Sequence, residues 1–191
     1  MTTSASGSTI VVGLGRGNKS LFTGVPTDND NTAPYQTIGT PHAYPISTDS
    51  GTAVYALPRA KGGPGFQVMA ANGPSTGGNT DEMTMFVVEV THSSNVVDFA
   101  WLNSTATNPT SSVSVTTTGP ATLVAFWWGD STQVNSVVSN DGFTVLDRQT
   151  LATDEVQGAS AVKSVTAAGK YTVTWTTNPA QPAGLWLVAV E

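Results

Sequence analysis

Hydrophobic and polar residues alternate in short runs along the whole chain. Residues 112–117 alternate cleanly, whereas residues 8–15, 121–128 and 184–190 are largely apolar and lie between Gly, Pro, Asn and Asp residues. Both patterns are typical of strands, the first half-buried and the second fully buried. They predict strands near residues 8–15, 34–39, 51–58, 65–71, 82–91, 112–117, 121–128, 134–138, 143–148, 158–166, 170–177 and 184–190. Because long runs of helix-forming residues are missing, we expect an all-β fold.

The predicted strands occur twice in the same order. Residues 8–17 can be laid over 121–130, 25–29 over 137–141, 53–54 over 161–162, 65–68 over 170–173, and 85–89 over 187–191. This predicts an internal duplication that gives two tandem β-sandwich units, of Greek-key, jelly-roll or immunoglobulin-like type. We assign residues 1–104 to the first unit, 105–111 to a linker and 112–191 to the second. Duplicated β-modules commonly form scaffolds or binding surfaces, which favours a non-enzymatic role.

The two units differ at their edges. By the same alignment, the counterpart of residues 112–117 in the first unit would lie before Met1, and the first unit instead carries an extra apolar segment at residues 96–102. Either this segment fills the vacant edge, or the edge is open. An open edge has unpaired N–H and C=O groups that accept a strand from another chain.

Strand periodicity distinguishes two aromatic residues. Successive side chains point to opposite faces of a strand, so Phe126 and Trp128 share one face. In the first unit, Gly13 and Gly15 occupy the aligned positions and carry no side chain. One interpretation is that Phe126 and Trp128 pack in a core or between the two units. The other is that they contact a partner protein or stack on a sugar ring.

The composition limits the classes of partner. Charged residues make up 10% of the chain, compared with about 25% in an ordinary soluble protein. The net charge is −6, and the seven Lys and Arg residues are scattered, so we expect no binding to nucleic acid. There is no cysteine, which excludes disulfides and cysteine nucleophiles. No apolar run approaches the roughly 20 residues that span a bilayer, so we expect no membrane insertion.

Few residues have the spacing of a chemical site. Asp28 and Asp30 alternate with Asn residues and are candidate calcium ligands, but the central Gly and distal Glu of a calcium loop are absent, and the segment equally fits a turn. His42 and His92 are the only histidines and belong to no metal-binding or catalytic motif. We therefore expect no catalytic residues, no cofactor and no enzymatic activity.

Four segments of the second unit carry a resemblance to known proteins. They are residues 142–147, 158–161, 168–175 and 185–190. Together they resemble β-sandwich modules of bacterial surface proteins and of phage virion or tail-associated proteins. The resemblance implies adhesion, decoration or carbohydrate contact, and it carries over no functional residue. A chain rich in Thr, Ser and Gly that starts at Met1 without a signal peptide fits a phage virion surface. The alternative is an extracellular or cell-surface protein whose export signal has been removed.

These observations lead to two functional hypotheses. The first is a non-enzymatic structural protein, such as a phage decoration, spike or fibre-associated component, that contacts copies of itself or capsid and tail proteins. The second is a carbohydrate-binding adhesion module that recognises a surface glycan. In both hypotheses a small set of aromatic side chains makes the contact: Phe126, Trp128, Tyr35 and Tyr44.

Overall fold

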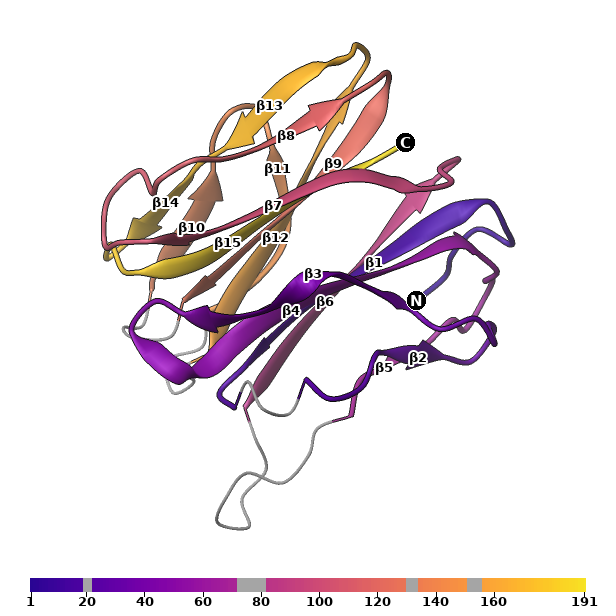
Figure 1. Cartoon of the computed structure of the whole chain (residues 1–191), viewed down its shortest axis with the longest axis horizontal. Helices are drawn as coiled ribbons and strands as arrows, with labels where there is room; N and C mark the ends of the chain where they lie inside the picture. Colours follow the sequence, from indigo (N-terminus) through magenta and orange to yellow (C-terminus); the bar gives the residue numbers. More distant parts are fainter. Residues whose placement is uncertain (19–21, 72–81, 130–133, 151–155) are drawn as a thin grey trace.

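The chain is all-β, as the sequence predicts. The computed structural model describes residues 1–18, 22–71, 82–129, 134–150 and 156–191, and these form strands and connecting loops without a helix (Figure 1). Consequently, the described part of the chain has no helix with the length and apolar character needed to cross a bilayer.

Two large antiparallel sheets form the centre of the molecule. The first has four strands in the order β3 (Gln36–Tyr44), β4 (Ser47–Ala60), β1 (Ser8–Arg16) and β6 (Met83–Thr91). The second has five strands in the order β11 (Thr144–Gln149), β12 (Gln157–Val165), β9 (Ala121–Gly129), β15 (Ala183–Val190) and β7 (Val96–Ser104). The central strands β1 and β15 are buried at every position, and β9 at every position except Thr122, which explains why their sequences are largely apolar.

Short strand pairs cover the outer faces. Over the five-stranded sheet, β8 (Val113–Thr117) pairs with β13 (Gly169–Val173), and β10 (Ser136–Ser139) pairs with β14 (Trp175–Asn178). A core that includes Trp127 and Trp175 lies beneath them. On the four-stranded sheet, β2 (Thr27–Asp28) pairs with β5 (Val68–Met69), and the core of that face includes Tyr55 and Phe66.

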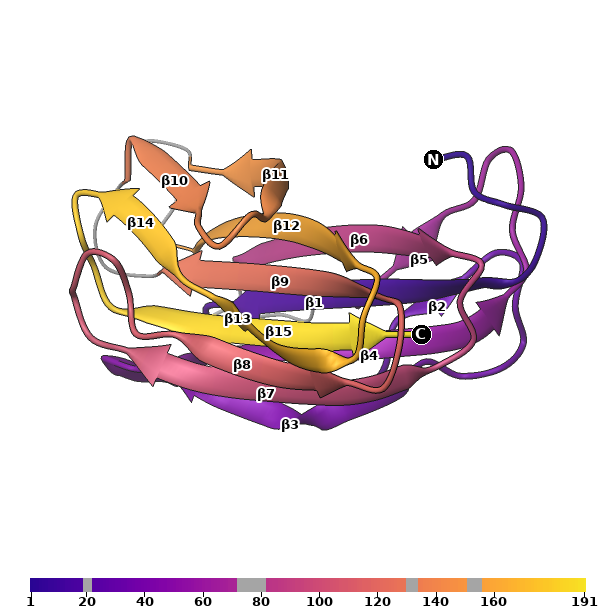
Figure 2. The same ribbon diagram turned by 90° about the horizontal axis from the view of Figure 1, so that it is seen from above.

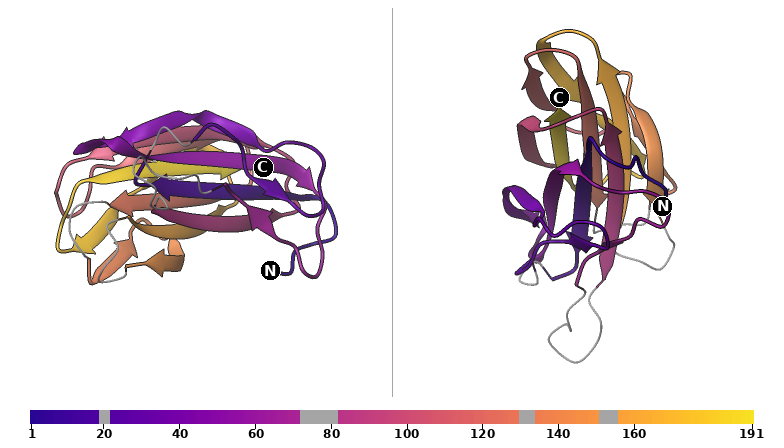
Figure 3. Two further views of the ribbon diagram at one scale, coloured as in Figure 1. Left: turned by 90° about the horizontal axis from the view of Figure 1, so that it is seen from below. Right: turned by 90° about the vertical axis from the view of Figure 1, so that its right-hand side faces the viewer.

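The inner faces of the two large sheets share one core. It joins side chains of β1, β4 and β6 to side chains of β9 and β15, including Val11, Phe86, Phe126, Trp128 and Trp186. Figures 2 and 3 show the two sheets stacked with their strands roughly aligned. β9 lies over β1, and β12 lies over β6, so β11 extends beyond the last strand of the four-stranded sheet (Figure 2).

Several strand boundaries differ from the prediction. The strands predicted at residues 34–39 and 51–58 extend into the long β3–β4 hairpin, because β3 continues past Gly39 and Pro41. The register shifts between Ile38 and His42, and Gly39 adopts a φ of 68° there, a conformation that glycine tolerates without strain. The strand predicted at 65–71 is reduced to β5, and the one at 170–177 divides into β13 and β14.

Of the two alternatives for the first unit's edge, filling by residues 96–102 does not occur. Those residues lie in β7, which pairs antiparallel with β15 at the edge of the five-stranded sheet. Residues 1–3 instead lie beside residues 63–66, where the Thr3 N–H donates to the Gly63 carbonyl and the Met1 ammonium to the Phe66 carbonyl. Residues 1–3 therefore lie beside residues 63–66 in the same way as β8 lies beside β13. The division at residues 104 and 112 stays a prediction.

Candidate binding groove at the edge of the four-stranded sheet

Phe126 and Trp128 pack between the two large sheets. Both side chains are almost fully buried, and their rings stack with centroids 5.3 Å apart. A Cβ atom added to Gly13 would lie 2.6 Å from the Trp128 ring, and one added to Gly15 would lie 2.4 Å from it. The two glycines of β1 therefore leave the space that the aromatic rings of β9 occupy. In this structure the rings contact the opposite sheet and are not exposed to a partner or a sugar.

Tyr35 and Tyr44 are also buried. Tyr35 belongs to the outer core of the four-stranded sheet, and burial, together with the nearby Asp28 carboxylate, raises its pKa above the ordinary value. The Tyr44 hydroxyl donates a hydrogen bond of 2.6 Å to the Pro182 carbonyl, just before β15. Both tyrosines thus make internal contacts, and neither presents an open ring face for stacking.

The Asp28 carboxylate accepts hydrogen bonds within its own turn. Its Oδ1 accepts hydrogen bonds from the backbone N–H groups of Asp30 and Asn31, at 2.8 and 2.7 Å. This is the local bonding pattern by which Asp stabilises turns. Asp30 is exposed. No cluster of three or more metal-ligating side chains occurs among residues 1–18, 22–71, 82–129, 134–150 and 156–191.

One side of the interface between the large sheets is closed by contacts between β3 and β7. The His42 ring stacks on Trp101 with centroids 3.6 Å apart and an angle of 10° between the planes. The Asn103 side chain donates to the Ala43 carbonyl at 3.2 Å. Burial lowers the pKa of His42 below its ordinary value, which favours the neutral ring against the indole. This stack could not be predicted from the sequence, because its partners lie in different sheets.

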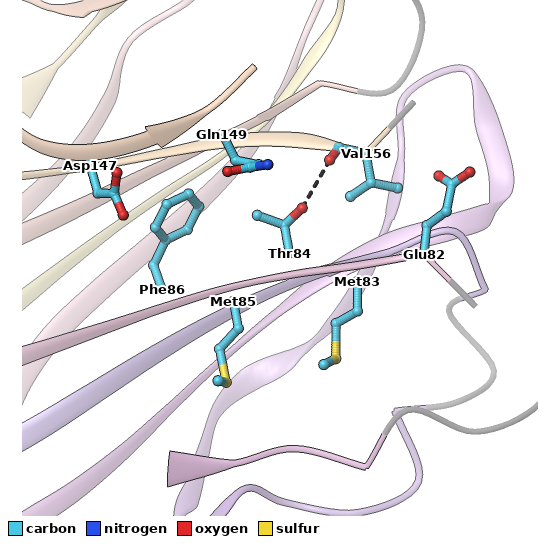
Figure 4. A pocket seen from close by; sticks show the side chains of 8 residues that line it. All are labelled: Glu82, Met83, Thr84, Met85, Phe86, Asp147, Gln149 and Val156. Atoms are coloured by element: carbon cyan, nitrogen blue, oxygen red, sulfur yellow. Dashed lines mark hydrogen bonds between the residues drawn. The ribbon is translucent and has the colours of Figure 1, made fainter. Parts of the chain in front are cut away.

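On the opposite side, where β11 extends beyond β6, there is a groove of about 390 Å³. It lies between β6 and the pair β11–β12, and the residues that line it are Glu82, Met83, Thr84, Met85, Phe86, Asp147, Gln149 and Val156. Asp147 and Gln149 point across the groove toward Phe86 and Thr84, whereas Met83 and Met85 point to the other side of β6 (Figure 4). The Thr84 hydroxyl donates to the Val156 carbonyl at 2.8 Å and fixes the inner wall.

Alternate residues of β6 direct their backbone N–H and C=O groups toward this groove. The Gly17 N–H donates to the Glu82 carbonyl at 3.1 Å, so Glu82 and every second residue after it direct their backbone groups toward β1. Met83, Met85 and Val87 therefore direct their N–H and C=O groups outward. Within the described part of the chain, no strand pairs with this side of β6.

The side chains of the groove set its chemical character. Glu82 and Asp147 contribute carboxylates, Gln149 an amide and Phe86 an apolar floor, and none of the described residues that line the groove is a Lys or Arg. Such a surface favours a partner that brings backbone hydrogen bonds and positive charge. The strand at residues 82–91 was predicted from its sequence. The lack of a described neighbour at its outer edge was not predicted, because sequence periodicity does not indicate which side of a strand is paired.

Glu89, near the end of β6, binds residues of the N-terminal segment and of β1. Its Oε1 accepts hydrogen bonds of 2.7 Å from the Ser4 N–H and from the Ser8 hydroxyl. Burial alone would raise the pKa of Glu89, but these bonds outweigh it and hold the pKa below the ordinary value of 4.5. Glu191, at the end of β15, is bonded in the same way by Thr118 and Gly119, and its pKa is also lowered.

A pH titration of stability tests the role of Glu89. A carboxyl group with a lowered pKa in the folded state stabilises the fold above its unfolded pKa, and this contribution is lost as the pH falls through the folded value. We expect Glu89→Gln to cost about 1 kcal/mol at neutral pH and to flatten the decline of urea-unfolding stability below about pH 5. Asp30→Asn removes the same charge from an exposed loop and serves as the control. Equal pH profiles for Glu89→Gln and wild type would contradict the assignment.

Comparisons with known proteins do not assign this fold or groove to a family. No protein-family model matches the chain, nor does any curated protein or solved structure.

Proposed function

We propose that the chain is a non-enzymatic structural protein that works through protein–protein contacts, as a decoration, spike or fibre-associated component of a phage virion surface. The observation that carries this proposal is the outer edge of β6, which no described strand pairs with and which lies beside a groove lined by Glu82 and Asp147. Such an edge is a ready template for pairing with another chain, and compact β-proteins otherwise cover or interrupt it. The assignment to a phage particle rests on the sequence resemblance of residues 142–191 to β-sandwich modules of phage virion or tail-associated proteins and of bacterial surface proteins.

We further propose that the chain arose by tandem duplication of one β-sandwich unit. The strand order β3-β4-β1-β6 has its counterpart in β11-β12-β9-β15, and the pair β2–β5 has its counterpart in β10–β14. Asn29 after β2 donates its N–H to the Gln67 carbonyl just before β5, and Asn140 after β10 donates to Thr174 just before β14. Similar hydrogen bonds in similar places support common ancestry more strongly than composition does.

The strand registers support the same proposal with one adjustment. Leu14 pairs with Ala53 and Met85, and Ala125 pairs with Ala161 and Leu187. The sequence alignment also matched Ala53 to Ala161 and Met85 to Leu187, but it aligned Leu14 with Trp127. A shift of two residues in β1 reconciles all three strands, and it keeps every side chain on the same face.

No observation favours the carbohydrate-binding alternative. The aromatic side chains expected to stack on a sugar, Phe126, Trp128, Tyr35 and Tyr44, are buried. A sugar platform requires an exposed ring face, which these four side chains lack.

Particle fractionation tests the proposed function. Cells that produce the chain together with its own phage should yield particles in which the chain bands at a fixed copy number through a density gradient, detected by quantitative mass spectrometry. A chain found only in the soluble fraction, with no saturable binding to purified particles, would contradict the proposal.

A further inference from the structure

We propose that the outer edge of β6 receives one extended strand from a different protein, which adds antiparallel to β6 and carries alternating cationic and apolar residues. This inference rests on the proposed function, because it names the surface and the kind of partner through which the protein would act. It concerns the groove between β6 and β11.

The other sheet provides the precedent for an added strand. β15 occupies the same place in the order of its sheet as β6 does in the four-stranded sheet, and β7 pairs antiparallel with its outer side over residues 183–190. That addition makes the second sheet five-stranded. Over the described ranges of the chain, β6 has no such neighbour, so the first sheet has one strand fewer than the second. An added strand would give both sheets five strands.

The position of the groove corresponds to this missing strand. β12 lies over β6, and β11 lies one strand further out, with no strand of the four-stranded sheet beneath it (Figure 2). Neighbouring strands are about 4.8 Å apart and stacked sheets about 10 Å apart. A strand that extends the sheet at β6 therefore lies directly under β11, in the space between β6 and the Asp147 and Gln149 side chains.

The same geometry disfavours a second copy of this chain as the occupant. Antiparallel pairing of two β6 strands requires a twofold axis perpendicular to the sheet. That axis would place β11 of the second copy over β6, in the position that β12 already fills. The overhang of β11 thus leaves room for a single extended segment and not for the edge of a second two-layered molecule.

The side chains of the groove specify the sequence pattern of the strand. Every second residue of the added strand shares the face of Thr84 and Phe86 and meets Asp147 and Gln149 on β11 (Figure 4). Lys or Arg at these positions complements the acidic lining. The intervening residues share the face of Met83, Met85 and Val87, which pack against the outer core, and apolar side chains extend that face. The outward N–H and C=O groups of β6 supply the hydrogen bonds in both cases.

A peptide titration tests the pattern. The probe is a fluorescent nine-residue peptide of alternating Lys and Val, added to the full-length protein and followed by anisotropy. A block peptide with the same Lys and Val content controls for attraction to the net charge of −6, and an alternating Glu and Val peptide controls for charge sign. We expect binding of the alternating Lys peptide only, weakening with added salt.

Two variants locate the binding site. Met85→Pro removes one outward N–H, keeps the hydrogen bonds between β6 and β1, and places a ring in the path of the added strand, so binding should weaken by about tenfold or more. Met85→Val keeps the N–H and should bind as wild type does. Asp147→Lys, on β11, reverses the charge over the groove and should weaken binding by about fivefold or more. This second variant leaves β6 intact, so the test does not depend on how well the proline variant folds.

Amide hydrogen exchange decides how the peptide binds. Strand addition should slow exchange at Met83, Met85 and Val87, whose N–H groups point outward, and leave Thr84 and Phe86, already bonded to β1, unchanged. The inference is overturned by equal binding to Met85→Pro and Asp147→Lys, by no preference over the block peptide, or by protection of the outward amides without peptide. The proposed function has its own test: it is contradicted when the wild-type chain is absent from particles. If Met85→Pro enters particles at the wild-type copy number, only the assignment of the contact to the β6 edge is rejected.

Discussion

Replacing Trp128 by alanine is expected to destabilise the chain by about 3–5 kcal/mol, the usual cost of deleting a large buried ring. Trp128 is 2% exposed and lies between the two large sheets, in contact with Phe126 and Phe86. Urea unfolding followed by circular dichroism measures the effect. Leu146→Ala, at a side chain that is 52% exposed, is the control and should change stability by less than about 0.5 kcal/mol.

A double-mutant cycle with Gly15 tests whether the ring and the glycine are complementary. Gly15→Val alone should cost about 1–3 kcal/mol, because its side chain would overlap the Trp128 ring. In the combination with Trp128→Ala, the valine enters the space that the ring has left, so the two costs should not add. A coupling of about 1 kcal/mol or more is expected. Strictly additive costs would show that Gly15 and Trp128 do not share this space.

Sequence periodicity predicted the strands of this fold better than their partners. The alternation of faces in β9 correctly separated Phe126 and Trp128 from Trp127, which lies in the core beneath the short strand pairs. It also identified Gly13 and Gly15 as positions that lack a side chain. It did not show that these glycines face the two rings, because sheet-to-sheet packing joins residues that are far apart in the sequence.

The candidate site was harder to predict for the same reason. The sequence left open whether residues 96–102 pair within the first unit. They pair with β15, and the outer edge of β6 is therefore unpaired within the described residues. Glu82 and Asp147 come from different sheets, and only the overhang of β11 brings their side chains to one groove.

Residues 112–191 are expected not to fold alone. This segment lacks β7, so the outer edge of β15 would be open, and it lacks the four-stranded sheet that covers Val124, Phe126, Trp128, Trp186 and Val188. Exposing each such side chain costs about 1.5–3 kcal/mol, and the sum is comparable with the whole stability of a small domain, about 5–15 kcal/mol. Near-ultraviolet circular dichroism should show no ordered tryptophan signal. A fragment of residues 93–191 is the matched control. It restores β7 but still lacks the four-stranded sheet, and it should also not fold.

The claim that one shared core unites the two large sheets is tested most directly in the intact chain, by differential scanning calorimetry. Because the inner faces of both large sheets belong to a single core, and Trp186 of β15 donates a hydrogen bond of 2.8 Å to Thr52 of β4, neither sheet can unfold without exposing the other. We predict one thermal transition whose calorimetric and van't Hoff enthalpies agree. Two resolved transitions, one for each large sheet, would contradict the claim.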